Sequence, residues 1–189
     1  MLIFLNFKWQ LKRIFDLVFS LLVLIFFSWL LLICYIVCSI ETRSNGIFIQ
    51  TRVGQFGQLF LIYKLKTIHP KTQKVTYFGN LFRKSKFDEL PQFYNVILGD
   101  MSVVGPRPDI QGYYDTLEGE ERKILELKPG ITSEASIKYR NEDALLEQQI
   151  DPVLYNDTVI FPDKVKMNLH YYYAHSFIKD LKIILKTIY

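Results

Sequence analysis

The pattern of hydrophobic positions is most distinctive near the N-terminus. From Ile14 to Ile40 the chain reads IFDLVFSLLVLIFFSWLLLICYIVCSI, and Asp16 is the one charged residue in this run of 27. A helix needs roughly 20 apolar residues to cross the hydrocarbon core of a bilayer. The run exceeds that length and lacks the small-residue cleavage site of a signal peptide. It predicts a retained membrane segment, so we divide the chain into an anchoring segment, residues 1–43, and a domain outside the bilayer, residues 44–189.

Beyond this segment the pattern changes to short strands and helices. Branched and aromatic residues predict strands at IFIQ (47–50) and LFLIYKL (59–65), and Gly54 and Gly57 between them predict the turn of a hairpin. Residues 67–79 are mostly polar and predict a loop. Helices are predicted over 88–98, 113–127, 141–150 and 162–175. The expected fold is a small, mostly helical α/β domain with a short β-hairpin.

The last segment, SFIKDLKIILKTIY (176–189), is amphipathic. Apolar residues such as Ile178 and Leu185 share one helical face, and Lys179, Lys182 and Lys186 occupy another. This pattern is typical of a helix that lies on an anionic membrane surface. A helix packed on the domain's own core would show the same periodicity, and both alternatives stay open.

Positive charges flank the apolar run on both sides. The 189-residue chain carries a net charge of +4, which includes Lys8, Lys12 and Arg13 before the run and Arg43 and Arg52 after it. Basic flanks mark the cytoplasmic side of a membrane segment. Basic residues at both ends favour a re-entrant segment that enters and leaves by the same face, and an ordinary single span is the alternative.

Candidate chemistry is concentrated in FDELPQFYNVILGDMSVVGPRP (87–108). Asp88 and Glu89 are adjacent acids, and Arg107 stands between two prolines that restrict its backbone. A structural interpretation makes Asp88 the N-cap of a helix. A functional interpretation makes the segment a phosphate site, in which the two carboxylates hold Mg²⁺ and the Arg107 guanidinium grips phosphate oxygens.

Five ordered motifs together resemble the bacterial sugar transferases known as monotopic phosphoglycosyl transferases. They are KRIFDLVFS (12–20), IQTRVG (49–54), FLIYKLKT (60–67), the segment 87–108, and KPGIT (128–132). The resemblance implies transfer of a phosphosugar from a nucleotide-sugar, usually a UDP-sugar, to membrane polyprenyl phosphate, with release of UMP. This reaction starts the assembly of a surface glycan. It also implies Mg²⁺ as cofactor and a catalytic domain on the cytoplasmic face of a bacterial inner membrane.

The resemblance assigns roles to particular residues. It makes Asp88 the nucleophile that forms a covalent phosphosugar-aspartate, with Glu89 beside it to place Mg²⁺ or move protons. Four basic residues are expected to bind substrate phosphate: Lys66, Arg83, Arg107 and Arg140. As structural alternatives, Lys66 and Arg83 are solvated surface charges, and Arg140 pairs with a neighbouring acid.

Two departures from the family pattern limit these expectations. Ser28-Trp29 replaces the Ser-Pro pair that commonly breaks the family's re-entrant helix, and SEASIKYRN (133–141) replaces a glycine-rich stretch. The identity of the sugar is therefore not predicted, and homo-oligomerisation is left open. No nucleic-acid partner is expected. The rival hypotheses are a membrane phosphohydrolase that uses the same acid pair, and a scaffold without catalysis in which Asp88 caps a helix.

Overall fold

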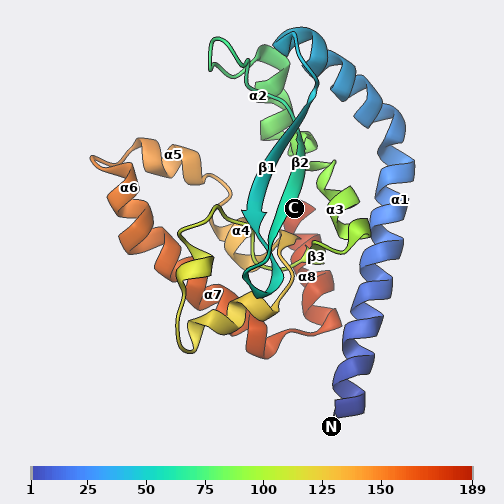
Figure 1. Ribbon diagram of the computed structural model, residues 1–189, viewed down its shortest axis with the longest axis vertical. Coiled ribbons are helices and arrows are strands. Elements are labelled where there is room, and N and C mark those ends of the chain that lie inside the picture. The colour runs from blue at the N-terminus through green and yellow to red at the C-terminus, as the bar shows by residue number, and fades with distance from the viewer. Residues whose placement is uncertain (1, 189) are drawn as a thin grey trace. The chain divides into compact units, whose positions relative to one another are not determined.

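Figure 1 shows a mostly helical α/β chain with small β-sheets. This computed structural model describes the backbone of residues 2–188 and the side chains of residues 10–187. The α-helices are α1 (Leu2–Thr42), α2 (Tyr77–Lys84), α3 (Gln92–Leu98), α4 (Glu134–Lys138), α5 (Glu142–Glu147), α6 (Pro152–Tyr155), α7 (Phe161–Ala174) and α8 (Phe177–Ile188). The strands are β1 (Ile47–Val53), β2 (Leu59–Leu65), β3 (Ser102–Val104) and β4 (Gly130–Thr132). Short 3₁₀ turns are η1 (Gln55–Gly57), η2 (Phe87–Glu89), η3 (Tyr114–Thr116) and η4 (Glu121–Glu126), and η5 (Asn156–Ile160) is a π-helical segment. The expected mostly helical α/β fold with a short β-hairpin is confirmed, and the membrane association of its N-terminal helix stays a prediction.

The chain forms two compact units. Unit 1 comprises the residues up to Arg52 together with Leu59–Val103, and unit 2 comprises Val53–Gln58 and the residues from Val104 onward. Unit 1 thus contains α1, most of the β1–β2 hairpin, α2, η2 and α3. The division into a membrane anchor and a catalytic domain concerns function, and it stays a prediction.

Helix α1 is one long helix with a bend in its middle. Its limbs, Gln10–Phe26 and Ser28–Thr42, meet at an angle of 65°. Ser28 Oγ donates a hydrogen bond to the Ile25 carbonyl at 2.8 Å, a back-bond of the kind that bends helices in place of a proline. Among the described residues no unbroken helix is long and apolar enough to cross a bilayer, whereas this bent pair meets that standard by length and composition.

The first limb of α1 packs on α3 and β3 through polar contacts. Arg13 donates to the carbonyls of Val96 and Ile97, at 2.6 and 3.0 Å, near the end of α3. Asp16 is buried; it accepts from Ser102 Oγ at 2.8 Å, and also from the Val103 amide at 3.2 Å. The charge inside the apolar run therefore faces protein. Lys8, one of the predicted flanking charges, lies outside the described side chains.

The second limb of α1 packs on the same unit through apolar contacts. Cys34 and Cys38 are buried in a cluster with Leu65 of β2 and Phe82 of α2. Both limbs expose large apolar side chains on the opposite face: Ile14, Val18, Leu21, Leu22, Ile25, Phe26, Trp29, Leu32, Ile33, Ile36 and Ile40. Over the residues whose side chains the structure describes, the helix is therefore two-sided, with one face on unit 1 and an apolar face exposed.

The hairpin of unit 1 forms as the sequence predicts, and α3 holds it from one side. Asn95, fully buried on α3, donates from Nδ2 to the Leu61 carbonyl at 2.7 Å and accepts the Tyr63 amide on Oδ1 at 3.1 Å. An asparagine side chain thus completes the hydrogen bonding of β2. Helix α2, within and beyond the predicted loop 67–79, was not expected; Thr76 caps it by accepting from the Gly79 amide.

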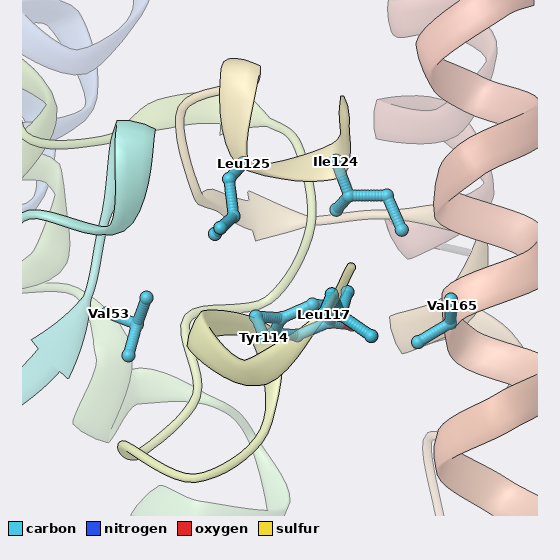
Figure 2. Close-up of a cluster of buried hydrophobic side chains, with 6 residues drawn as sticks. All are labelled: Val53, Tyr114, Leu117, Ile124, Leu125 and Val165. Atoms are coloured by element: carbon cyan, nitrogen blue, oxygen red, sulfur yellow. The ribbon is translucent and has the colours of Figure 1, made fainter. Parts of the chain in front are cut away.

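Unit 2 is organised around a cluster of buried apolar side chains that converge from a strand end, two 3₁₀ turns and a helix (Figure 2). The cluster comprises Val53, Tyr114, Leu117, Ile124, Leu125 and Val165. The prediction of a helix over 113–127 is wrong, because the segment forms two 3₁₀ turns, η3 and η4. Gly119 separates them at φ 56°, a left-handed conformation that interrupts a right-handed helix.

Helix α8 packs on unit 2 through a face that the sequence pattern did not reveal. Ile183 and Asp180 are buried, and Asp180 Oδ1 accepts a hydrogen bond from the Tyr171 hydroxyl at 2.5 Å. The predicted apolar face remains exposed, with Ile178 at 66% and Leu185 at 57%. Of the two alternatives for this helix, packing on the domain's own core is observed for one face, and contact of the exposed face with a membrane stays a prediction.

Candidate active site

The acidic pair lies on the 3₁₀ turn η2, just before α3. Lys86 opens the turn at φ 60°, and Pro91, which has no amide proton, stands at the start of α3. Pro91 cannot donate the bond that an α-helix would make at this position. The backbone instead forms 3₁₀ bonds between residues three apart, such as the bond from Leu90 N to Phe87 O at 3.2 Å. The helix expected from residue 88 therefore begins as a 3₁₀ turn.

Asp88 does not cap a helix. Lys86 occupies the N-cap position of η2 and Pro91 that of α3, and neither makes a side-chain capping bond. The Asp88 side chain is buried instead, with 9% of the residue exposed, and its Oδ1 has no hydrogen-bond partner within the part of the chain that the structure describes. The capping interpretation of Asp88 is wrong, and its burial needs another explanation.

Burial changes the acidity of Asp88. Loss of solvation, followed by repulsion from the adjacent Glu89 carboxylate, raises the pKa of Asp88 from 3.8 to about 6. The positive charges of Lys64, Lys86 and Arg83 oppose this rise in pKa. At neutral pH the group is still mainly ionised, and it is more basic than an ordinary aspartate.

Glu89 is held by a lysine that the sequence analysis missed. Lys64 Nζ, on β2, lies 3.1 Å from Glu89 Oε1, and both side chains are largely buried. Lys66, the lysine that was predicted to bind phosphate, donates to Ser44 Oγ at 3.1 Å. Lys64 lies near the end of β2 and Lys66 directly follows it, and residues two apart on an extended strand share a face. That spacing is the signal that could have drawn attention to Lys64.

The other predicted basic residues are divided between the units. Arg83 lies in the last turn of α2 in unit 1, where its charge acts on Asp88. Arg107 and Arg140 belong to unit 2. Arg140 donates to the Thr187 carbonyl at 2.6 Å, close to the end of α8, and lines a cavity of about 410 Å³ together with Tyr139 and Lys186. One partner of Arg140 is thus a carbonyl at the end of a helix.

The turn that carries Arg107 is built by two sequence motifs that cross closely. Gly105 donates to the Thr132 carbonyl at 3.0 Å, and Gly130 donates to the Pro106 carbonyl at 2.8 Å. A Cβ atom at Gly130 would lie 2.1 Å from the Gly105 nitrogen. The crossing therefore requires glycine, and it joins the GPRP and KPGIT motifs into one support for Arg107.

The carboxylate oxygens of Asp88 and Glu89 are donors of the kind that Mg²⁺ prefers. The described residues contain no group of three or more His, Cys, Asp or Glu side chains arranged to hold a metal. Proteins usually bind Mg²⁺ through one or two carboxylates, and waters and substrate phosphates complete the octahedron. Two adjacent carboxylates, one with an unpartnered buried oxygen, are compatible with this mode of binding.

Comparison with known proteins identifies the family. A family model described as bacterial sugar transferase matches residues 7–189. The chain belongs to the bacterial sugar transferase family. The predicted family and enzyme class, a transferase of sugar phosphates, are confirmed.

Several curated members of the bacterial sugar transferase family are similar over most of this chain. An uncharacterized sugar transferase, EpsL of Bacillus subtilis, is 32% identical over 94% of the chain and 85% of its own length. The UDP-glucose:undecaprenyl-phosphate glucose-1-phosphate transferase of Caulobacter vibrioides is 31% identical over 94% of the chain and 68% of its own length. The Escherichia coli enzyme of the same name is 34% identical over 95% of the chain, which spans 39% of that relative.

Proposed function

We propose that this sugar transferase moves a sugar phosphate from a UDP-sugar to polyprenyl phosphate, releases UMP and so starts the assembly of a surface glycan. The observation that carries the proposal is the state of Asp88: buried, without a partner on Oδ1 among the described residues, and raised in pKa to about 6. The names of the Caulobacter and Escherichia relatives give the same donor and acceptor classes for those proteins.

In the first step an Asp88 carboxylate oxygen bonds to the sugar-linked phosphorus. The phosphorus–oxygen bond to the UMP half breaks, and its electron pair leaves with UMP. A carboxylate with a pKa near 6 is a better nucleophile than an ordinary aspartate and is still ionised at pH 7. Lys64 and Arg83, whose charges act on Asp88, offset the negative charge that gathers as carboxylate and phosphate approach.

In the second step an oxygen of polyprenyl phosphate bonds to the same phosphorus, and the Asp88 carboxylate leaves unchanged. The product is a polyprenyl diphosphosugar, and the two half-reactions follow ping-pong kinetics. Arg107, on its glycine-supported turn, binds phosphate oxygens through its planar fork, with Lys66 and Arg140 as further candidate phosphate ligands. Asp88 and Glu89 would hold Mg²⁺, which would supply positive charge for the transferring phosphoryl oxygens.

The same proposal places the protein at the cytoplasmic face of a bacterial inner membrane, with α1 as a re-entrant segment. The support is that both limbs of α1 pack on unit 1: Arg13 and Asp16 act in the first limb, and Cys34 and Cys38 in the second. A full span would carry one of these attachments to the far side of the bilayer, away from the charged site. A cysteine placed at residue 4 should react with an impermeant label only from the cytoplasmic side; labelling from outside would establish a full span.

The reaction itself is tested with the full-length protein in detergent. Incubation with UDP-sugar, Mg²⁺ and polyprenyl phosphate should give UMP and a lipid-linked phosphosugar. Without acceptor, intact-mass analysis should detect a phosphosugar adduct that Asp88→Asn does not form, while exposed Glu118→Gln serves as the matched control. Phosphate release without the lipid product would indicate a phosphohydrolase, and the absence of any turnover would favour a scaffold.

A further inference from the structure

A second buried polar group near Asp88 also has no partner. Gln92, the first residue of α3, is 2% exposed, and its side-chain Nε2 is buried without a hydrogen-bond partner among residues 10–187. Nearly all buried polar groups in folded proteins are hydrogen-bonded, so each exception calls for an explanation. A ligand that brings its own acceptor is one such explanation.

The backbone places the two residues with unpartnered groups close together along the chain. Leu90 (φ −52°, ψ −37°) and Pro91 (φ −59°, ψ −19°) are both right-handed helical, so η2 continues directly into α3. A 3₁₀ turn that runs into an α-helix places residues three to four apart on successive turns. Asp88 and Gln92 therefore lie one turn apart on a continuous helical path, and both side chains are buried.

The neighbouring amide shows that this surface is well packed. Asn95 lies on the same buried face of α3, one turn after Gln92, and both atoms of its amide are engaged by the backbone of β2, at Leu61 and Tyr63. The two amides thus differ in use. Asn95 holds the hairpin, whereas the buried Nε2 of Gln92 has no hydrogen-bond partner among the described residues.

We propose that Gln92 is a substrate-binding residue, whose Nε2 donates a hydrogen bond to a non-bridging oxygen of the phosphoryl group that Asp88 attacks. This inference rests on the proposed function, and it adds a residue to it. A neutral donor next to the nucleophile attracts the phosphoryl oxygen without lowering the basicity of the carboxylate, as a cation would. Because negative charge spreads over these oxygens during transfer, the bond strengthens toward the transition state.

Gln92→Met tests the proposal, since methionine keeps the length and burial of glutamine and removes the donor. We expect the rate of UMP release during adduct formation to fall about 100-fold, the typical effect of losing one oriented donor. We expect the melting temperature to stay at or above the wild-type value, because the buried donor that is removed has no partner among the described residues. Asn95→Met is the matched comparison, and its melting temperature should fall because its amide holds β2.

Binding of UDP separates this inference from the proposed function. The terminal phosphate of UDP stands in for the attacked phosphoryl group, and its binding with Mg²⁺ is measured by calorimetry. Gln92→Met should bind UDP about fivefold more weakly than the wild type, a factor typical of one net hydrogen bond. If no UDP-sugar supports turnover, the proposed function fails. Even then, weaker UDP binding by Gln92→Met would support a contact between Gln92 and phosphate. Wild-type UDP binding by Gln92→Met, or a melting temperature lowered as in Asn95→Met, would overturn it.

Discussion

Replacing Asp88 with asparagine tests the consequence of burying its carboxylate. The pKa of Asp88 in the folded protein is about 6, above the ordinary 3.8, so the folded protein binds this proton more tightly than the unfolded chain. Such a group favours folding fully below about pH 4, and that contribution is lost as the pH rises through about 6. The difference between about 6 and 3.8, at about 1.4 kcal/mol per pKa unit, gives about 3 kcal/mol at pH 7.

Asp88→Asn should therefore abolish transfer and stabilise the protein. The buried amide that replaces the acid keeps part of the cost of desolvation, so the expected gain at pH 7.5 is about 1–3 kcal/mol. Had Asp88 been a helix N-cap, asparagine would have served equally well and changed stability by no more than about 1 kcal/mol. Destabilisation linked to a reactive group is a common trade between stability and activity.

The assay is urea unfolding of full-length wild type and variant in the same detergent at pH 7.5 and pH 4. The stability gain of Asp88→Asn should be largest at pH 7.5 and should nearly vanish at pH 4, where both proteins carry a neutral group. Glu89→Gln is the matched control; it should lose stability at pH 7.5, because Glu89 is paired with Lys64 at 3.1 Å. A destabilised Asp88→Asn at pH 7.5, or a gain that does not change with pH, would refute the reasoning.

Two further predictions concern the surroundings of the site. Lys64→Met removes a positive charge that lowers the pKa of Asp88, so the acid limb of the pH profile of kcat/KM should move to higher pH; an unchanged limb would show that this charge does not act on the nucleophile. Gly130→Ala places a Cβ 2.1 Å from the Gly105 nitrogen and should cost about 3–5 kcal/mol in urea unfolding, through overpacking and two lost hydrogen bonds. Gly112→Ala, with φ +98° and no atom within 4 Å of the added carbon, should cost only about 1 kcal/mol, and equal losses at both glycines would contradict the crossing.

The membrane segment shows which features can be predicted from the order of residues along the chain and which cannot. Its apolar length and the hairpin that follows could be predicted because they depend on local composition and alternation. The sequence could not predict which side of α1 faces protein, because apolar residues occur on every side of this helix. Packing on unit 1 decides it, with Asp16 bound to Ser102 and with Cys34 and Cys38 buried near Leu65.

The candidate active site likewise has features that the sequence predicts and features that it does not. Ordered motifs were enough to identify the family and to select Asp88, Glu89 and the basic residues. Local rules then made Asp88 a helix cap, because they describe a carboxylate before a helix without reference to what covers it. The structure instead buries this side chain and raises its pKa.

What the sequence determined by itself is therefore the family, the acid pair and the local elements, all of which depend on residue type and short spacing. What the tertiary structure decided is the environment of each group: Lys64 beside Glu89, and the buried, unpartnered atoms of Asp88 and Gln92 within the described residues. Lys64 and Glu89 are 25 residues apart. Burial and the contacts of distant residues arise only when separate segments pack together, and pKa and reactivity follow from them.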